Sequence, residues 1–289
     1  MVQVSGVMAF AGGLCMAHNA VWQKSRTVLS AAATGGARRS LAVSTTPAPE
    51  IILYQYKICP FCNGLKAFMD YFNLPYRCVE VNPTSKEEIK TWSPDYKKVP
   101  IVTIDGRQVN DSLTIIDDLV QMLVKNGTIT ASESERFTGD SAKKWTDWSG
   151  KTLAVLLFPN ITRNFSESWQ AFAYVNDVPH FDTKAKLMNR YLGPVAMWAA
   201  QGKIKKKYNI DDEREELYNA LKVWTDEIGE AEFHGGTKPA LADLYAFGTI
   251  RALDGLDTHT DILADDGPLK SWYESMARQV GGTASTGWE

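Results

Sequence analysis

The chain has 289 residues, of which 44% are hydrophobic and 11% aromatic. This composition excludes wholesale disorder, and the length suits one large domain or two ordinary ones. The formal net charge is −3, from 31 basic and 34 acidic residues, so the chain has no charge excess that would attract nucleic acid.

Residues 1–49 differ in composition from the rest of the chain. They contain no Asp or Glu, and four basic residues lie among small side chains: Lys24, Arg26, Arg38 and Arg39. This pattern is typical of a transit peptide, so we expect import into an organelle, the mitochondrion in particular. The apolar stretch 7–17 could instead be a signal-peptide core or an interfacial membrane anchor, and the whole segment could be an unprocessed disordered tail. The alternative locations are membrane association or the cytoplasm after processing. No stretch approaches 18 uninterrupted apolar residues, so we expect no membrane-spanning helix.

From residue 50 the sequence alternates between strand and helix signals. The predicted elements are a strand at 51–56, a helix from Pro60, a strand at 77–81, a short helix at 85–92, a hairpin of strands over 99–109 and a final helix after residue 112. Pro60 suits a first helical position because its missing N–H would have no partner there. Asp105-Gly106 provides the hairpin turn. The order β-α-β-α-β-β-α predicts an α/β domain over residues 50–129.

Beyond residue 130 the apolar residues recur at helical spacing. Leu217, Leu221, Trp224 and Ile228 are four, three and four residues apart. Because no strand pattern competes with this spacing, we predict an all-helical domain of five to seven helices over residues 130–289. The expected fold class is therefore an α/β domain followed by an all-α domain.

Cys59-Pro60-Phe61-Cys62 is the motif with the most specific chemistry. A cysteine reacts as the thiolate, and the free N–H groups and dipole of a helix N-terminus stabilise that anion. Cys59 takes this position, and Cys62, one turn deeper, can resolve a mixed disulfide. Tyr56 and Phe61 flank the pair. Half of a zinc site is the alternative, but no second CxxC motif or suitably spaced His pair supplies the other ligands, so we predict thiol chemistry.

Two further motifs are ambiguous when each is taken alone. Val99-Pro100 opens a strand, where proline is tolerated, and most X–Pro bonds are trans. Asp111-Ser112 is explained as a helix cap, although the same helix N-terminus can hold a ligand carboxylate. A cap and a binding site are compatible at this position.

Together, the CPFC motif, Val99-Pro100 and Asp111-Ser112 resemble the glutaredoxin and glutathione-transferase superfamily. The resemblance implies a thioredoxin-like domain followed by a transferase-type helical domain, with glutathione as the cofactor. It also implies that Pro100 is cis, that the Val99 backbone pairs with the cysteinyl part of glutathione, and that Asp111 and Ser112 receive its γ-glutamyl end.

Longer runs resemble the membrane-associated prostaglandin E synthase type 2 family more closely. These runs are Leu53–Cys62, Leu74–Tyr76, Val79–Pro83, Lys97–Ile101, Asn110–Ser112, Phe158–Asn160, Arg163, Gly235-Gly236, Lys238-Pro239, Leu241–Leu244 and Asp254–Asp257. The activity ascribed to that family is the isomerisation of prostaglandin H, an endoperoxide, to prostaglandin E. The resemblance implies a homodimer that acts on a small-molecule lipid endoperoxide or disulfide. Peripheral membrane contact is an alternative, and the near-neutral charge predicts no nucleic-acid partner.

The resemblance also assigns roles to the residues around the CPFC motif. It implies that the Cys59 thiolate attacks the endoperoxide and that Cys62 supports it. Tyr56 and Phe61 would line the substrate pocket, with the Tyr56 hydroxyl placed to orient or protonate the leaving oxygen. The alternatives are a glutaredoxin-like thiol-disulfide oxidoreductase and a non-catalytic scaffold that binds glutathione or haem.

Two positions depart from the family patterns. Ala240 stands where a transferase-type helix usually has a Ser or Thr cap, so we expect Asp243 to cap through its carboxylate. Family members described as haem binders place His and other polar residues where this chain has Ala154–Phe158. Haem is therefore a weaker expectation than glutathione.

Overall fold

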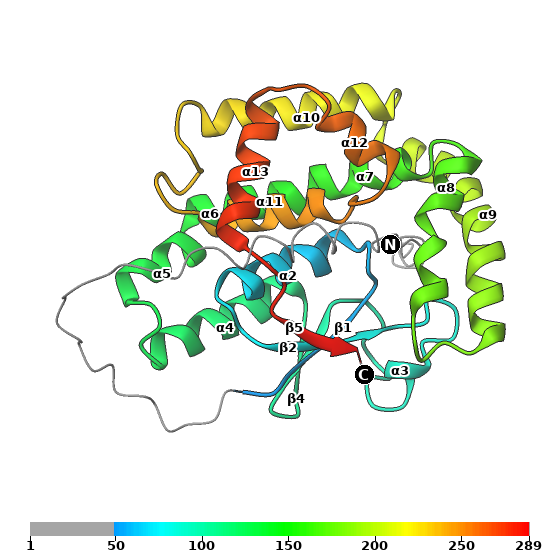
Figure 1. The fold of residues 1–289 in the computed structure, drawn as a ribbon, viewed down its shortest axis with the longest axis horizontal. Helices are drawn as coiled ribbons and strands as arrows, with labels where there is room; N and C mark the ends of the chain where they lie inside the picture. Colours follow the sequence, from blue (N-terminus) through cyan, green and yellow to red (C-terminus); the bar gives the residue numbers. More distant parts are fainter. Residues whose placement is uncertain (1–48, 289) are drawn as a thin grey trace, which may run out of the picture.

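The computed structural model describes residues 49–288, in which a sheet with flanking helices is joined to a larger helical layer (Figure 1). The expectations for the leader concern residues outside this described part, apart from Pro49. Among the described residues, no helix is both long enough and apolar enough to cross a membrane.

The sheet has five strands in the order β4-β3-β1-β2-β5. They are β1 (Ile51–Gln55), β2 (Tyr76–Glu80), β3 (Ile101–Ile104), β4 (Arg107–Asn110) and β5 (Ser285–Trp288). The central strand β1 runs parallel to β2 and antiparallel to β3, with Leu53 opposite Cys78 on one side and Val102 on the other. The element order predicted for the α/β domain is confirmed, as is the hairpin turn, in which Asp105 and Gly106 both have positive φ.

Three helices belong to this first half: α2 (Pro60–Tyr71), α3 (Glu87–Lys90) and α4 (Ser112–Lys125). Helix α2 begins at Pro60 as predicted and buries Leu65 and Phe68 in the core. Helix α3 is shorter than the expected 85–92. The reason is local, because the Asn82 side chain accepts hydrogen bonds from the backbone N–H groups of Thr84 and Ser85 and holds that segment in a turn.

The second half contains more helices than expected. They are α5 (Ala131–Thr138), α6 (Asp140–Trp148), the π-helix η3 (Ser149–Leu153), α7 (Ala154–Ile161), α8 (Phe165–Ala171), the 3₁₀ helix η4 (Ala173–Asp177), α9 (Thr183–Tyr208), α10 (Glu213–Ile228), α11 (Leu241–Arg251), α12 (Asp257–Ile262) and α13 (Pro268–Val280). The prediction of five to seven was too low, because helices as short as α8 and α12 hold too few residues for a helical period to show in the sequence.

Strand β5 contradicts the expectation that everything after residue 130 is helical. Ser285 pairs with Tyr76, so β5 lies parallel to β2 at the edge of the sheet. The segment before it is fixed by the buried carboxylate of Asp70, which accepts hydrogen bonds from the Ala284 N–H and the Tyr76 hydroxyl, both at 2.9 Å. The free N–H and C=O groups of the β2 edge supply the pairing that the Ser-Thr-Gly-Trp sequence does not predict.

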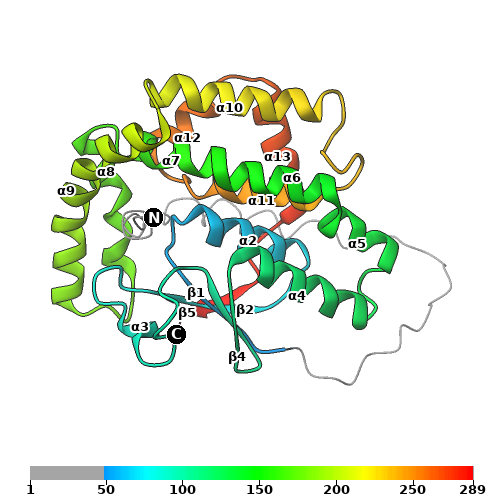
Figure 2. The ribbon, with the colours of Figure 1, turned by 180° about the vertical axis from the view of Figure 1, so that it is seen from behind.

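Helix α2 lies between the sheet and the helical layer that contains α6, α7 and α11 (Figures 1 and 2). Its contact with α11 is close because two glycines face the partner helix. A Cβ atom on Gly248 would overlap the backbone of Asn63, and one on Gly64 would lie 2.8 Å from the ring of Tyr245. The two halves therefore share one continuous hydrophobic core.

Asp243 caps α11 through its carboxylate, as the sequence predicted. One carboxylate oxygen accepts hydrogen bonds from the N–H groups of Ala240 (2.9 Å) and Gly235 (3.1 Å), and the other accepts one from His234 N–H (2.8 Å). Asp243 therefore ties the start of α11 to the preceding loop, without the hydroxyl that a Ser or Thr cap would provide.

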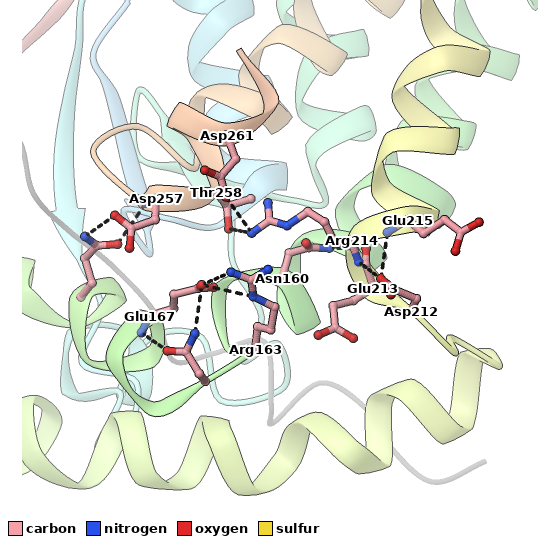
Figure 3. Close-up of polar contacts among 12 residues, drawn as sticks. Asn160, Arg163, Glu167, Asp212, Glu213, Arg214, Glu215, Asp257, Thr258 and Asp261 are labelled. Carbon is pink, nitrogen blue, oxygen red and sulfur yellow. Dashed lines mark hydrogen bonds and ion pairs between the residues drawn. The ribbon is translucent and has the colours of Figure 1, made fainter. Parts of the chain in front are cut away.

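Several residues of the family-like motifs in the helical half form a polar cluster that joins α7, α8, α10 and α12 (Figure 3). Asn160 donates to the carbonyl oxygen of Glu213 at 2.7 Å, and Arg163 pairs with Glu167 at 2.7 Å. Arg214 reaches Asp261 on α12 at 3.3 Å. These residues hold the helices together, and none of them lines the cavity described next.

Candidate functional site

A cavity of about 560 Å³ lies between the two halves. Its lining includes seven of the eight predicted site residues: Tyr56, Cys59, Phe61, Val99, Pro100, Asp111 and Ser112. The eighth, Cys62, is fully buried behind the wall. Residues that are distant in sequence are thus brought together as the motifs suggested, while their individual chemical roles stay predictions.

Cys59 is the N-cap of α2, the position expected for a reactive thiol. Its N–H donates to the Tyr56 carbonyl at 2.9 Å, which closes the turn between β1 and α2. The side-chain amide of Asn63 donates to the carbonyls of Lys57 (2.7 Å) and Cys59 (3.0 Å). The turn that presents the sulfur is therefore fixed from inside the helix. Cys59 and Cys62 are both free thiols.

The pKa values of the two thiols are shifted in opposite directions. Burial by itself would raise the pKa of Cys59, but hydrogen bonds from the Cys62 thiol and from the N–H groups of Cys62 and Phe61 outweigh it and lower the pKa below its usual value. Burial, together with the bond to Cys59 and its charge, raises the pKa of Cys62 well above the usual value. Of the two thiols, Cys59 is therefore the one that ionises more readily.

Tyr56 and Phe61 form the apolar wall beside the sulfur. Tyr56 is only 4% exposed, and its hydroxyl has no hydrogen-bond partner among the described residues. Burial raises the pKa of Tyr56, so the hydroxyl stays protonated at neutral pH. Phe61 lies against Gly150 of the π-helix η3, where an added Cβ would approach its ring to 3.3 Å.

The segments around Pro100 and Asp111 form a further part of the cavity lining. The Val99–Pro100 bond is cis, as the family resemblance implied. Asp111 caps α4 by accepting the Leu113 N–H at 3.1 Å, and it does so with a φ of 73°, an unusual value for a residue other than glycine. The Ser112 hydroxyl bonds to the hydroxyl of Tyr245 at 2.7 Å, which still leaves it hydrogen-bonding capacity for a ligand.

Sequence reasoning did not find the rest of the lining: Tyr96, Lys97, Lys98, Gly150, Lys151, Val155 and Tyr208. Three of these are lysines, so positive charge lies beside a cavity whose wall is otherwise largely apolar. Lys97 and Lys98 were part of a family-like run, but nothing in that run indicated a role. Gly150, Lys151 and Tyr208 come from the helical half, where no local motif points to the cavity.

The residues that line the cavity can be compared with the cofactors expected from the sequence, glutathione and haem. At the start of α4, the Ser112 hydroxyl and the neighbouring lysines supply donors that suit a ligand carboxylate, while the Asp111 carboxylate can accept from a cationic group. Among residues 49–288, no group of three or more His, Cys, Asp or Glu side chains is placed to hold a metal ion. Haem binding stays a prediction.

An α/β domain with a CxxC motif at a helix start, joined to a helical domain, has the architecture of a glutathione transferase. Residues 53–122 match the family model described as the glutathione S-transferase N-terminal domain. The β-etherase LigF from Sphingobium is 14% identical to this chain, and the similarity covers 78% of this chain and 94% of LigF with a TM-score of 0.53. That similarity shows the shared fold.

Two curated relatives narrow the assignment. The chain is 35% identical over 269 residues to prostaglandin E synthase 2 from Danio rerio, covering 79% of this chain and 71% of the relative. It is 30% identical over 318 residues to prostaglandin E synthase 2 from Mus musculus, covering 96% and 81%. The chain belongs to the prostaglandin E synthase 2 family.

Proposed function

We propose that this protein is a glutathione-dependent thiol enzyme that isomerises prostaglandin H, or a closely related lipid endoperoxide, to the corresponding prostaglandin E. The observation that carries the proposal is the position of Cys59, whose thiol has a lowered pKa and lies in a largely apolar cavity of about 560 Å³. An apolar cavity with one nucleophile and a few polar groups suits a lipid with one reactive centre.

The first chemical step is attack of the Cys59 thiolate on one endoperoxide oxygen. The S–O bond forms as the O–O bond breaks, and the electron pair of the O–O bond goes to the other oxygen. This leaving alkoxide takes the proton of the Tyr56 hydroxyl, because an alkoxide is a stronger base than a phenoxide. The first step therefore yields a hydroxyl group, a sulfur-bound oxygen and a Tyr56 phenoxide.

The second step restores the enzyme. The phenoxide removes the proton from the carbon that carries the sulfur-bound oxygen, the C=O bond forms, and the S–O bond breaks to release the Cys59 thiolate. Burial raises the pKa of Tyr56, which makes its phenoxide a stronger base for this task. The sum of the two steps is an isomerisation that consumes no oxidant or reductant.

Glutathione is proposed to bind along Val99-Pro100 and the start of α4, with Asp111 at its amino group and Ser112 at its γ-glutamyl carboxylate. Bound glutathione would supply a thiol: in a mixed disulfide of Cys59 with glutathione, the thiolate of a further glutathione would attack the glutathione sulfur, break the S–S bond and release the Cys59 thiolate and oxidised glutathione. The lysines beside this segment, Lys97 and Lys98, add positive charge for its glycyl carboxylate.

The deciding experiment compares the full chain with Cys59→Ser in an endoperoxide turnover assay with glutathione present. We expect kcat/KM to fall about a hundredfold or more, because Ser lacks an ionised nucleophile at neutral pH. Cys78→Ser is the matched control, since Cys78 is buried on β2 and does not line the cavity. Full turnover in Cys59→Ser would refute the proposed nucleophile.

The hydrogen bond between the thiols of Cys62 and Cys59 favours one alternative, disulfide exchange of the glutaredoxin type. In that case Cys62→Ser would abolish dithiol-dependent reduction of a mixed glutathione disulfide as fully as Cys59→Ser. An isomerase would keep most of its endoperoxide turnover in Cys62→Ser. Binding of glutathione without turnover in either assay would indicate a scaffold.

We also propose that the protein forms a homodimer through α9. This helix exposes an apolar stripe made of Leu187, Tyr191, Leu192, Val195 and Trp198, which is larger than the scattered apolar residues of a typical monomer surface. Sedimentation equilibrium of the wild type and of Trp198→Lys tests this proposal. A monomeric wild type would refute it.

For the location in the cell, we propose that residues 1–49 direct import into the mitochondrion. The support is their composition, which lacks acidic residues. A fusion of residues 1–49 to a fluorescent protein should colocalise with a mitochondrial marker, and diffuse cytoplasmic fluorescence would contradict the proposal.

A further inference from the structure

Glu80, the last residue of β2, is a buried carboxyl group in an unusual position. Its side chain is 0% exposed, and none of the ion pairs found within residues 49–288 includes it. By contrast, the buried Asp70 on α2 is paired with Arg251 at 2.9 Å. A buried carboxylate without a cation is costly, so its retention beside an active thiol calls for a reason beyond packing.

The contacts of Glu80 join three segments of the chain. One carboxylate oxygen accepts the N–H of Lys57 at 2.8 Å, and the other accepts the side-chain amide of Gln55 at 3.2 Å. The hydroxyl of Tyr174, from η4 in the helical half, also donates to the carboxylate. The backbone carbonyl of Glu80 accepts the ring N–H of His180 at 2.7 Å.

The contact to Lys57 matters most for the site, because Lys57 lies in the turn two residues before Cys59. Glu80 holds the N–H of Lys57, while Asn63 holds its carbonyl oxygen at 2.7 Å. Both backbone polar groups of Lys57, its N–H and its carbonyl, are therefore held by side chains. Glu80 does not line the cavity, so it acts on the thiol only through this turn and through its charge.

We propose that Glu80 is a positioning residue for Cys59: through the Lys57 N–H its buried carboxyl group holds the turn that presents the sulfur, and it brings a titratable charge to that turn. The proposal deepens the proposed function, because it rests on Cys59 as the reacting group. The two effects have opposite signs, since the hydrogen bond favours the thiolate geometry and the negative charge disfavours a second anion nearby.

The electrostatic surroundings support the second effect. Burial raises the pKa of Glu80 to about 7, and ionised Glu80 in turn raises the pKa of Cys59. The other titratable groups around Glu80 are Tyr56, Lys57, Lys66, Cys78, Glu88, Tyr174 and His180. Burial raises the pKa of Glu80 by more than the hydrogen bonds from the Lys57 N–H and the Tyr174 hydroxyl, and the charges of Lys66 and Lys57, lower it. The charge of Glu80 therefore appears as the pH rises through about 7, and from there it opposes ionisation of Cys59.

Two substitutions separate the roles. Glu80→Gln keeps an oxygen that accepts the Lys57 N–H but removes the charge, whereas Glu80→Leu removes both. The measurement is the rate of iodoacetamide alkylation of Cys59 in the full chain between pH 5.5 and 9.5, followed by peptide mass spectrometry. Glu88→Gln is the control, because Glu88 also accepts a backbone N–H, that of Asn82 at 2.8 Å, but does not act on Cys59.

We expect Glu80→Gln to alkylate about three times faster than wild type, or more, at pH 8, where Glu80 of the wild type is ionised and its charge raises the pKa of Cys59. Near pH 5.5, where Glu80 is protonated, the two rates should match. Glu80→Leu should alkylate more slowly than wild type at pH 8, because the freed turn weakens the bonds that stabilise the thiolate. A purely structural role would move both variants in the same direction.

Superimposed pH profiles for wild type, Glu80→Gln and Glu88→Gln would overturn the proposal, and so would slower alkylation in both Glu80 variants. If Glu80→Leu does not fold, the Glu80→Gln profile still decides. The alkylation measurement needs no lipid substrate. Endoperoxide turnover retained in Cys59→Ser would therefore refute the proposed function and leave the alkylation result intact.

Discussion

The buried carboxyl of Glu80 makes the stability of the protein depend on pH in a predictable direction. The pKa of Glu80 is raised from 4.5 to about 7, so the folded protein binds this proton more tightly than the unfolded chain. The stabilisation is fully present below about pH 4.5 and is lost as the pH rises through about 7. This rise in pKa corresponds to about 3 kcal/mol of unfolding free energy.

Replacing Glu80 by Gln removes this dependence. The amide oxygen still accepts the Lys57 N–H, but no charge has to be buried at high pH. The unfolding free energy of Glu80→Gln relative to wild type should therefore increase by about 3 kcal/mol between pH 4.5 and pH 8. Urea denaturation at pH 4.5, 6, 7 and 8, followed by tryptophan fluorescence, measures the difference directly.

The control for this experiment is Glu230→Gln, which removes one negative charge at an exposed position. Its difference from wild type should stay within about 0.5 kcal/mol across the pH range. A Glu80→Gln difference that stays constant from pH 4.5 to pH 8 would show that Glu80 titrates normally, and the reasoning about its burial would fail.

Three further predictions concern the helix contact and the cavity. Gly248→Ala should lower the unfolding free energy in urea by about 1–3 kcal/mol, because the new methyl group meets the backbone of Asn63; unchanged stability would contradict the close packing of α2 and α11. Ser112→Ala should raise the Kd for glutathione by about tenfold in isothermal calorimetry and leave Tyr245 without its partner, and an unchanged Kd would remove Ser112 from the binding site. Tyr56→Phe should lower kcat by about a hundredfold with little change in melting temperature, because the hydroxyl has no partner to lose; full activity would assign the proton transfer to another group.

The part of the cavity formed by the α/β half could be predicted, because local sequence patterns encode it. A β-prone run, a CPFC motif and a proline at the first helical position place Cys59 at the start of α2. The cap at Asp111 follows from the same kind of local rule. The cis state of Pro100 was expected only through the family resemblance, since an X–Pro bond taken alone is expected to be trans.

The lining residues of the helical half could not be predicted, because only tertiary packing brings them to the cavity. Lys151 lies in a π-helix, and Tyr208 ends a long helix, α9, that packs against α7, α8 and η4. Glu80 occupies an ordinary strand position in the sequence, and only the structure shows that its carboxyl is buried against the turn before Cys59. Its role depends on residues about twenty and about one hundred positions away.

The return of the chain to the sheet through β5 has a consequence for how the protein is made. During synthesis the first four strands leave the ribosome early, but the strand that covers the edge of β2 emerges last, at residues 285–288. Until then that edge is open to pairing with other chains. A nascent or truncated chain that ends before residue 285 is therefore expected to aggregate, and to depend on chaperones, more than the finished protein does.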